Sequence, residues 1–73
     1  MIDRETLLTY RLTDTERGLQ GSKALWLRAA PHIPFRQRAQ VDAAIRSTPE
    51  GQAVRVLLPR EVADRLLDAM ARG

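Results

Sequence analysis

The spacing of hydrophobic and polar side chains predicts three strands. Residues 7–12 and 23–29 alternate apolar and polar positions, which is the period-two pattern of a half-buried strand. Residues 52–58 alternate in the same way and form the clearest of the three patterns. Residues 13–22 are polar, contain two glycines and show no apolar period, so we expect a long exposed connection there.

Two helices are predicted, and a proline introduces each of them. Pro34 leads into a helix over residues 35–46, and Pro59 opens a second helix near the C-terminus. Residues 47–51 contain a proline and a glycine and end the first helix. Both helices carry apolar positions at helical spacing, which are Val41, Ala44 and Ile45 in the first and Val62, Ala63, Leu66, Leu67 and Met70 in the second.

The order strand, strand, helix, strand, helix predicts an α+β fold in one small domain over residues 1–73. We expect a three-stranded antiparallel sheet (β-β-α-β-α) with both helices packed on one face. The covered face would carry alternate apolar residues of the strands, which are Leu8, Tyr10, Leu12, Leu25, Leu27, Val54, Val56 and Leu58. The opposite face would carry the intervening residues, which are Thr9, Arg11, Trp26, Arg28, Arg55 and Leu57.

Arginine dominates the charge of the chain. Twelve basic residues against nine acidic ones give a formal net charge of +3, and eleven of the twelve are arginine. Arginine makes planar contacts with carboxylates, phosphates and aromatic rings, so this excess favours an acidic partner, either nucleic acid or an acidic protein surface. A GC-rich genome explains the same abundance of arginine and alanine, and the sequence leaves both explanations open.

The chain contains no cysteine, and His32 is its one histidine. Disulfide bonds and thiolate metal sites are therefore excluded, and stability depends on the hydrophobic core. The N-terminal residues lack the cationic and apolar segments of a signal peptide, and no apolar run reaches membrane-spanning length. We expect a cytoplasmic protein with no bound metal or cofactor.

No combination of residues indicates catalysis. His32 has no second histidine, cysteine or paired carboxylate at the spacing of a metal site or a nucleophile–base pair. Gly18 and Gly21 lack the lysine and the serine or threonine that follow in a phosphate-binding loop. We therefore expect a protein that is not an enzyme and has no small-molecule substrate.

The predicted basic face of the sheet is the candidate partner-binding site. It combines Arg11, Arg28 and Arg55 with Trp26, and both residue types are enriched at the energetic centres of protein interfaces. Arginine beside an aromatic ring also suits stacking on exposed bases. In the alternative interpretation arginine stems cover a structural tryptophan, and a register shift of one residue would move Trp26 into the core.

Residues 54–67 resemble the strand and first helix of ribbon-helix-helix DNA-binding repressors. This resemblance covers about a fifth of the chain, and the six residues that follow Leu67 are too few for the second helix of that fold. We therefore do not expect membership of that family.

In length, arginine-rich charge and absence of cysteine, the whole chain is similar to small bacteriophage proteins, such as those of Xanthomonas phages, that bind bacterial RNA polymerase. The similarity assigns no binding residues. It implies a non-enzymatic regulator in the host cytoplasm that inhibits transcription initiation, with antitermination as a further effect. The residues themselves leave two alternatives open, a basic nucleic-acid-binding module and a structural or assembly subunit.

Overall fold

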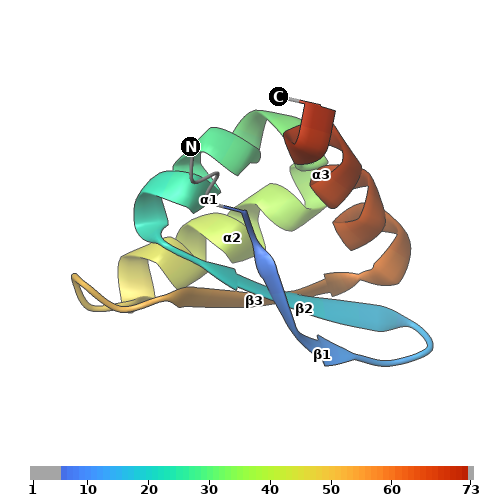
Figure 1. Ribbon diagram of the computed structural model, residues 1–73. Helices are drawn as coiled ribbons and strands as arrows, with labels where there is room; N and C mark the ends of the chain where they lie inside the picture. The colour runs from blue at the N-terminus through green and yellow to red at the C-terminus, as the bar shows by residue number, and fades with distance from the viewer. Residues whose placement is uncertain (1–5, 73) are drawn as a thin grey trace, which may run out of the picture.

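The computed structural model describes residues 6–72, which form a sheet under a layer of helices. In chain order the elements are β1 (Leu8–Leu12), β2 (Glu16–Gly21), α1 (Lys23–Ala29), the 3-10 helix η1 (Ala30–His32), α2 (Phe35–Ser47), β3 (Val54–Pro59) and α3 (Arg60–Arg72). The helices lie on one face of the sheet, and no described element covers the other face (Figure 1). The predicted α+β class and three-stranded antiparallel sheet are confirmed, with three α-helices in place of two.

The central strand of the sheet is β2, which pairs antiparallel with β1 and with β3. A short turn joins β1 to β2, in which the Thr13 backbone N–H donates to the Glu16 carbonyl at 2.9 Å and the Glu16 N–H donates to Thr13 Oγ1 at 2.9 Å. The expectation of a long exposed connection over residues 13–22 is therefore wrong. Leu19 is the one large buried side chain of β2, and the glycines of this strand remove the alternation by which a strand is recognised.

The segment predicted as the second strand is helix α1. Ser22 is its N-cap, and the Ser22 hydroxyl accepts a hydrogen bond from the Leu25 backbone N–H at 3.1 Å. Leu25, Trp26 and Ala29 are buried, a spacing that places all three on one side of a helix. The strand prediction over residues 23–29 is therefore wrong, because leucines at alternate positions of a short helix imitate the period of a strand.

The other helices and the last strand agree with the pattern. Helix α2 follows Pro34, whose carbonyl accepts hydrogen bonds from the backbone N–H groups of Gln37 and Arg38 at 3.0 and 3.1 Å. β3 and α3 follow each other without a loop, because Pro59 ends the strand and Arg60 begins the helix. The predictions for these three segments are confirmed to within a few residues at each end.

β3 is an edge strand whose exposed side is partly protected. The backbone of Leu57 is turned away from β2, and its carbonyl accepts a hydrogen bond from the Gln40 side chain of α2 at 2.7 Å. Pro59, two residues further on, has no N–H group to expose at this edge. These two features reduce the number of unpaired backbone groups at which another strand could add.

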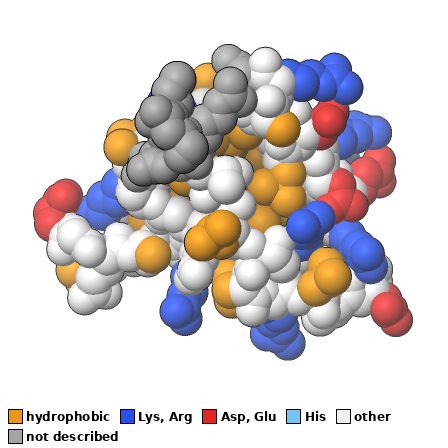
Figure 2. Space-filling model, in the orientation of Figure 1, with side chains coloured by type: hydrophobic (Ala, Val, Ile, Leu, Met, Phe, Trp, Pro, Cys, Tyr) orange, Lys and Arg blue, Asp and Glu red, His pale blue; other side chains and the backbone are white. Residues whose placement is uncertain are grey.

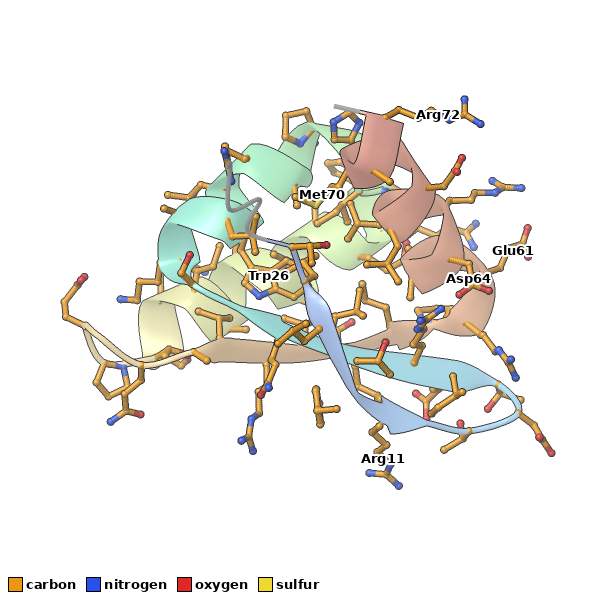
Figure 3. All side chains as sticks on the ribbon, in the orientation of Figure 1. Arg11, Trp26, Glu61, Asp64, Met70 and Arg72 are labelled. Atoms are coloured by element: carbon orange, nitrogen blue, oxygen red, sulfur yellow. The ribbon has the colours of Figure 1, made fainter. Side chains whose placement is uncertain are left out.

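Trp26 is the largest side chain of the core and is completely buried. Its indole Nε1 donates a hydrogen bond to the Val54 carbonyl at 2.9 Å, which joins α1 to the start of β3 (Figure 3). The expectation that Trp26 lies on an exposed basic face is therefore wrong. Within residues 6–72 the buried hydrophobic residues are Leu7, Leu19, Leu25, Trp26, Ala29, Ile33, Val41, Val54, Val56, Leu58, Ala63 and Leu66.

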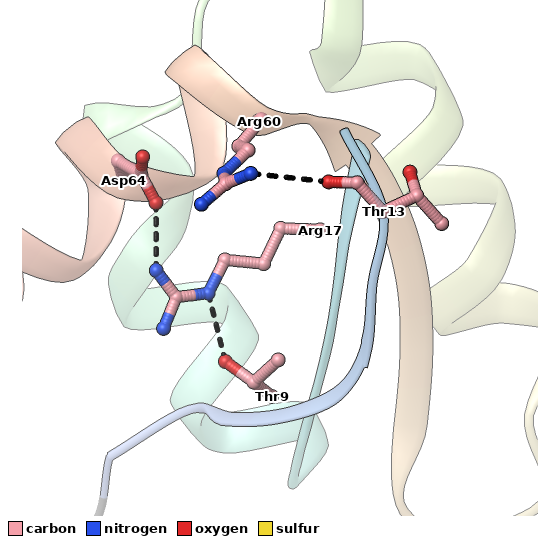
Figure 4. Close-up of polar contacts among 5 residues, drawn as sticks. All are labelled: Thr9, Thr13, Arg17, Arg60 and Asp64. Carbon is pink, nitrogen blue, oxygen red and sulfur yellow. Dashed lines mark hydrogen bonds and ion pairs between the residues drawn. The ribbon is translucent and has the colours of Figure 1, made fainter. Parts of the chain in front are cut away.

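Arg17 connects the β1–β2 hairpin to α3. Its Nε donates to Thr9 Oγ1 at 2.8 Å, and its Nη1 lies 2.7 Å from Asp64 Oδ1 (Figure 4). Arg60 Nη1 donates to the Thr13 carbonyl at 3.3 Å in the turn of the hairpin. Thr9 therefore faces the helical layer, and its expected place on the opposite face of the sheet is wrong.

We predict that Trp26→Phe lowers the free energy of unfolding by about 2 kcal/mol, because it removes a buried hydrogen bond and leaves unfilled volume in the core. Leu27→Ala, on the exposed side of the same helix, is the matched control and should change it by less than about 0.5 kcal/mol. Urea unfolding followed by far-ultraviolet circular dichroism measures both. Equal effects of the two substitutions would contradict the buried position of Trp26.

Candidate binding face of the sheet

The register of the strands determines which side chains lie on the open face. Val54, Val56 and Leu58 are buried against the helices, so the intervening residues of β3 lie on the opposite side. Strand pairing places their partners in β2 and β1 on that side as well. We call this surface the outer face, and its residues are Leu8, Tyr10, Arg11, Glu16, Gly18, Gln20, Arg55, Leu57 and Pro59.

A β-bulge in β1 places two consecutive side chains, Tyr10 and Arg11, on the outer face. Thr9 pairs with Leu19 and Arg11 pairs with Gly18, so Tyr10 is the extra residue between them. The ring lies against β2, because a Cβ atom added at Gly18 would be 2.6 Å from Tyr10 Cζ. Glycine at this position therefore provides the space that the ring occupies.

Arg55 is held beside this ring. Its Cζ lies 5.5 Å from the centroid of the Tyr10 ring, within the range of a cation–π contact. Its Nε donates a hydrogen bond to Gln20 Oε1 at 3.1 Å. The guanidinium group is therefore fixed at two points, and it forms no ion pair with a carboxylate in the described part of the chain.

Arg11 projects from β1 away from the helices (Figure 3). It is exposed and has no ion pair within residues 6–72. Figure 2 shows Lys and Arg side chains projecting below the sheet in the same view. Glu16 is the one carboxylate of the outer face and is half-buried, so the two arginines leave this surface positively charged.

β1 also exposes apolar side chains that were expected in the core. Leu8, Tyr10 and Leu12 are 56%, 40% and 54% exposed. The reason for Leu8 and Tyr10 is that Leu7, which precedes the strand, is the buried residue at 3% exposure, so the inward positions before the bulge are displaced by one residue. Leu12, after the bulge, pairs with Arg17 on the helix-facing side but is not covered there. The expectation of a covered face under Leu8, Tyr10 and Leu12 is therefore wrong.

The structure brings together two of the four residues predicted for the binding site. Arg11 and Arg55 share the outer face, whereas Trp26 lies in the core and Arg28 is exposed on α1 in the helical layer. Tyr10 was missed, because the predicted alternation assigned it to the covered face together with Leu8 and Leu12. The available signal was a glycine within a neighbouring strand, which commonly marks the close approach of another group.

An open groove of about 510 Å³ adjoins the outer face, where β1 and β3 begin and β2 ends. Leu8 and Gln20 belong both to the groove and to the outer face, and Ala53 adds a further apolar wall. The ion pair between Lys23 Nζ and Glu50 Oε1, at 3.3 Å, lies at the rim.

Within residues 6–72, no group of three or more histidine, cysteine, aspartate or glutamate side chains could hold a metal ion. None of the described helices is long and apolar enough to cross a membrane. No protein family, curated protein or solved structure matches the chain. The outer face offers two guanidinium groups, a phenol ring and apolar side chains, a combination suited to contact with a macromolecular surface.

We predict opposite effects of Gly18→Ala in two backgrounds. In the wild-type chain the new methyl group displaces the Tyr10 ring and lowers the free energy of unfolding. In a Tyr10→Ala background the same substitution should raise it by about 0.5 kcal/mol, because alanine restricts the unfolded chain more than glycine does. Urea unfolding of the four chains gives the coupling energy, expected near 1 kcal/mol. A coupling of zero would show that the ring does not lie on Gly18.

Proposed function

We propose that the chain is a non-enzymatic regulator that docks on a larger protein through the outer face. The observation that carries this proposal is the fixed position of the Tyr10 ring and the Arg55 guanidinium, with the exposed Leu8 on the same surface. Aromatic and arginine side chains supply most of the binding energy at protein interfaces. Side chains that are already ordered lose little entropy on binding.

Bacterial RNA polymerase is the partner that we propose, and inhibition of transcription initiation is the proposed effect, with antitermination as a second effect of the same contact. The support for this partner is the similarity in length and arginine-rich charge to phage proteins that bind the polymerase. The outer face adds a positively charged surface with exposed apolar side chains. Such a surface is complementary to an acidic protein patch that also contains apolar residues.

Direct nucleic-acid binding is the second candidate, because an arginine beside an exposed aromatic ring suits base stacking. The Leu8 side chain on this face favours a protein instead, since it is more than half exposed and offers nothing to phosphate. The charge of the outer face is also small, with two arginines and one glutamate. Phosphate binding usually draws on a larger number of cationic contacts.

The test is binding to purified, nuclease-treated bacterial RNA polymerase holoenzyme, measured by biolayer interferometry together with promoter-dependent transcription. The double variant Arg11→Glu/Arg55→Glu should bind at least about tenfold more weakly than wild type, since arginines at the centre of an interface often contribute more than 1 kcal/mol each. It should also fail to inhibit transcription.

The matched control is Arg36→Glu/Arg46→Glu, which changes the net charge equally at exposed positions of α2. It should bind within about twofold of wild type, because rim or remote charges contribute little. Equal weakening by both double variants would contradict the outer face as the docking surface. Absence of binding by the wild type would exclude RNA polymerase. Binding to a dT20 oligonucleotide that falls steeply with salt would favour the second candidate.

A further inference from the structure

We propose that the outer face receives an extended acidic segment of the partner protein, which inserts one apolar side chain into the adjoining groove and places carboxylates on Arg55 and Arg11. This inference rests on the proposed function, because it specifies what the docked protein presents. It differs from a flat contact because the segment must fill the groove and contact both Arg11 and Arg55 at the same time.

The groove provides the apolar part of this site. Leu8 is 56% exposed on one wall, Ala53 is exposed on another, and Leu25 is buried at 2% exposure beneath them. Removing an apolar side chain from water in such a groove is favourable in proportion to the area covered. The volume of about 510 Å³ has room for one large side chain and part of the backbone that carries it.

The groove leads directly to Arg55. Gln20 lines the groove and accepts the hydrogen bond of Arg55 Nε at 3.1 Å. Gln52 and Ala53 also line a second hollow of about 530 Å³, and Arg55 lines that hollow. An apolar side chain in the groove therefore lies next to a guanidinium group that has no carboxylate partner among the described residues.

Arg11 sets the length of the segment. Leu8 pairs with Gln20 and Arg11 pairs with Gly18, so the two are separated by two positions of β2, which corresponds to roughly 7 Å at the rise of a strand. A carboxylate two or three residues from the apolar anchor of an extended peptide reaches that distance. The charge favours an acidic occupant, because four other cations of the described chain, at positions 17, 23, 65 and 72, are already paired with carboxylates, whereas Arg11 and Arg55 are not.

The experiment uses a fluorescein-labelled heptapeptide with a central phenylalanine that is flanked on each side by glycine, glutamate and aspartate. Fluorescence anisotropy against the full-length chain should show saturable binding. Replacement of the phenylalanine by serine in the peptide should weaken binding at least fivefold. Amide resonances of residues 8, 20 and 53 should shift together with those of Arg11 and Arg55 in the nuclear magnetic resonance spectrum.

Variants of the chain test each part separately. Ala53→Glu introduces a carboxylate between the two hollows and should weaken binding at least fivefold. Ala39→Glu makes the same change at an exposed position of α2 and should have an effect below twofold. Leu8→Ser removes apolar surface without a change of charge. It should therefore weaken binding of the phenylalanine peptide at least threefold and leave binding of the serine peptide unchanged. Thermal unfolding of each variant verifies that it is folded.

Three results would overturn the inference. The first is no binding of the peptide up to millimolar concentration, and the second is equal weakening by Ala53→Glu and Ala39→Glu. The third is displacement of the peptide by a dT10 oligonucleotide at lower concentration than by unlabelled peptide, which would assign the surface to nucleic acid. If RNA polymerase binds the Ala53→Glu variant normally but does not bind the Arg11→Glu/Arg55→Glu variant, the proposed function stands and the inferred insertion into the groove is wrong.

Discussion

The burial of Trp26 is the constraint on which the arrangement of the molecule depends. Its side chain is the largest of the hydrophobic core, and its N–H group needs a hydrogen-bond acceptor inside that core. The Val54 carbonyl supplies the acceptor at 2.9 Å. This requirement holds α1 over the beginning of β3, and the other helices pack beside α1 on the same side of the sheet (Figure 1).

A one-sided core leaves the other face of the sheet exposed, and this is the face that we propose as the docking surface. The inward-facing hydrophobic side chains of β3 are buried beneath the helices. The exposed face therefore carries only the side chains that alternation and the bulge place there. Tyr10 points outward by the alternation of β1, the bulge keeps Arg11 on the same face, and Gly18 provides the space for the Tyr10 ring. Arg17 contributes from the opposite side, since its bonds to Thr9 and Asp64 hold the hairpin against α3. The same strands therefore carry the hydrophobic core on one face and the proposed docking surface on the other.

The success of sequence reasoning differed between the halves of the chain for physical reasons. The segment from α2 to α3 follows simple periods, and its prolines mark both helix starts, so its elements were predicted. The N-terminal half of the chain does not follow such simple periods. β2 contains two glycines that remove its alternation, and α1 is so short that leucines at alternate positions imitate a strand. For the candidate site, Arg55 was predicted from strand alternation, whereas Arg11 lies on the outer face only because of a bulge that no pattern of residue types reveals. Tyr10 was assigned to the covered face because β1 was predicted one residue out of register. Trp26 was misplaced because its segment was assigned to a strand.

The most direct test of this account is hydrogen exchange of the Trp26 indole N–H, followed by nuclear magnetic resonance. Trp26 is the one tryptophan of the chain, so its indole signal is unambiguous. The buried hydrogen bond to Val54 predicts that this proton exchanges only through global unfolding, at the same free energy as the slowest backbone amides of β2 and β3. Rapid exchange under native conditions would contradict the account, because it would place the indole at the surface, as the strand prediction for residues 23–29 implied.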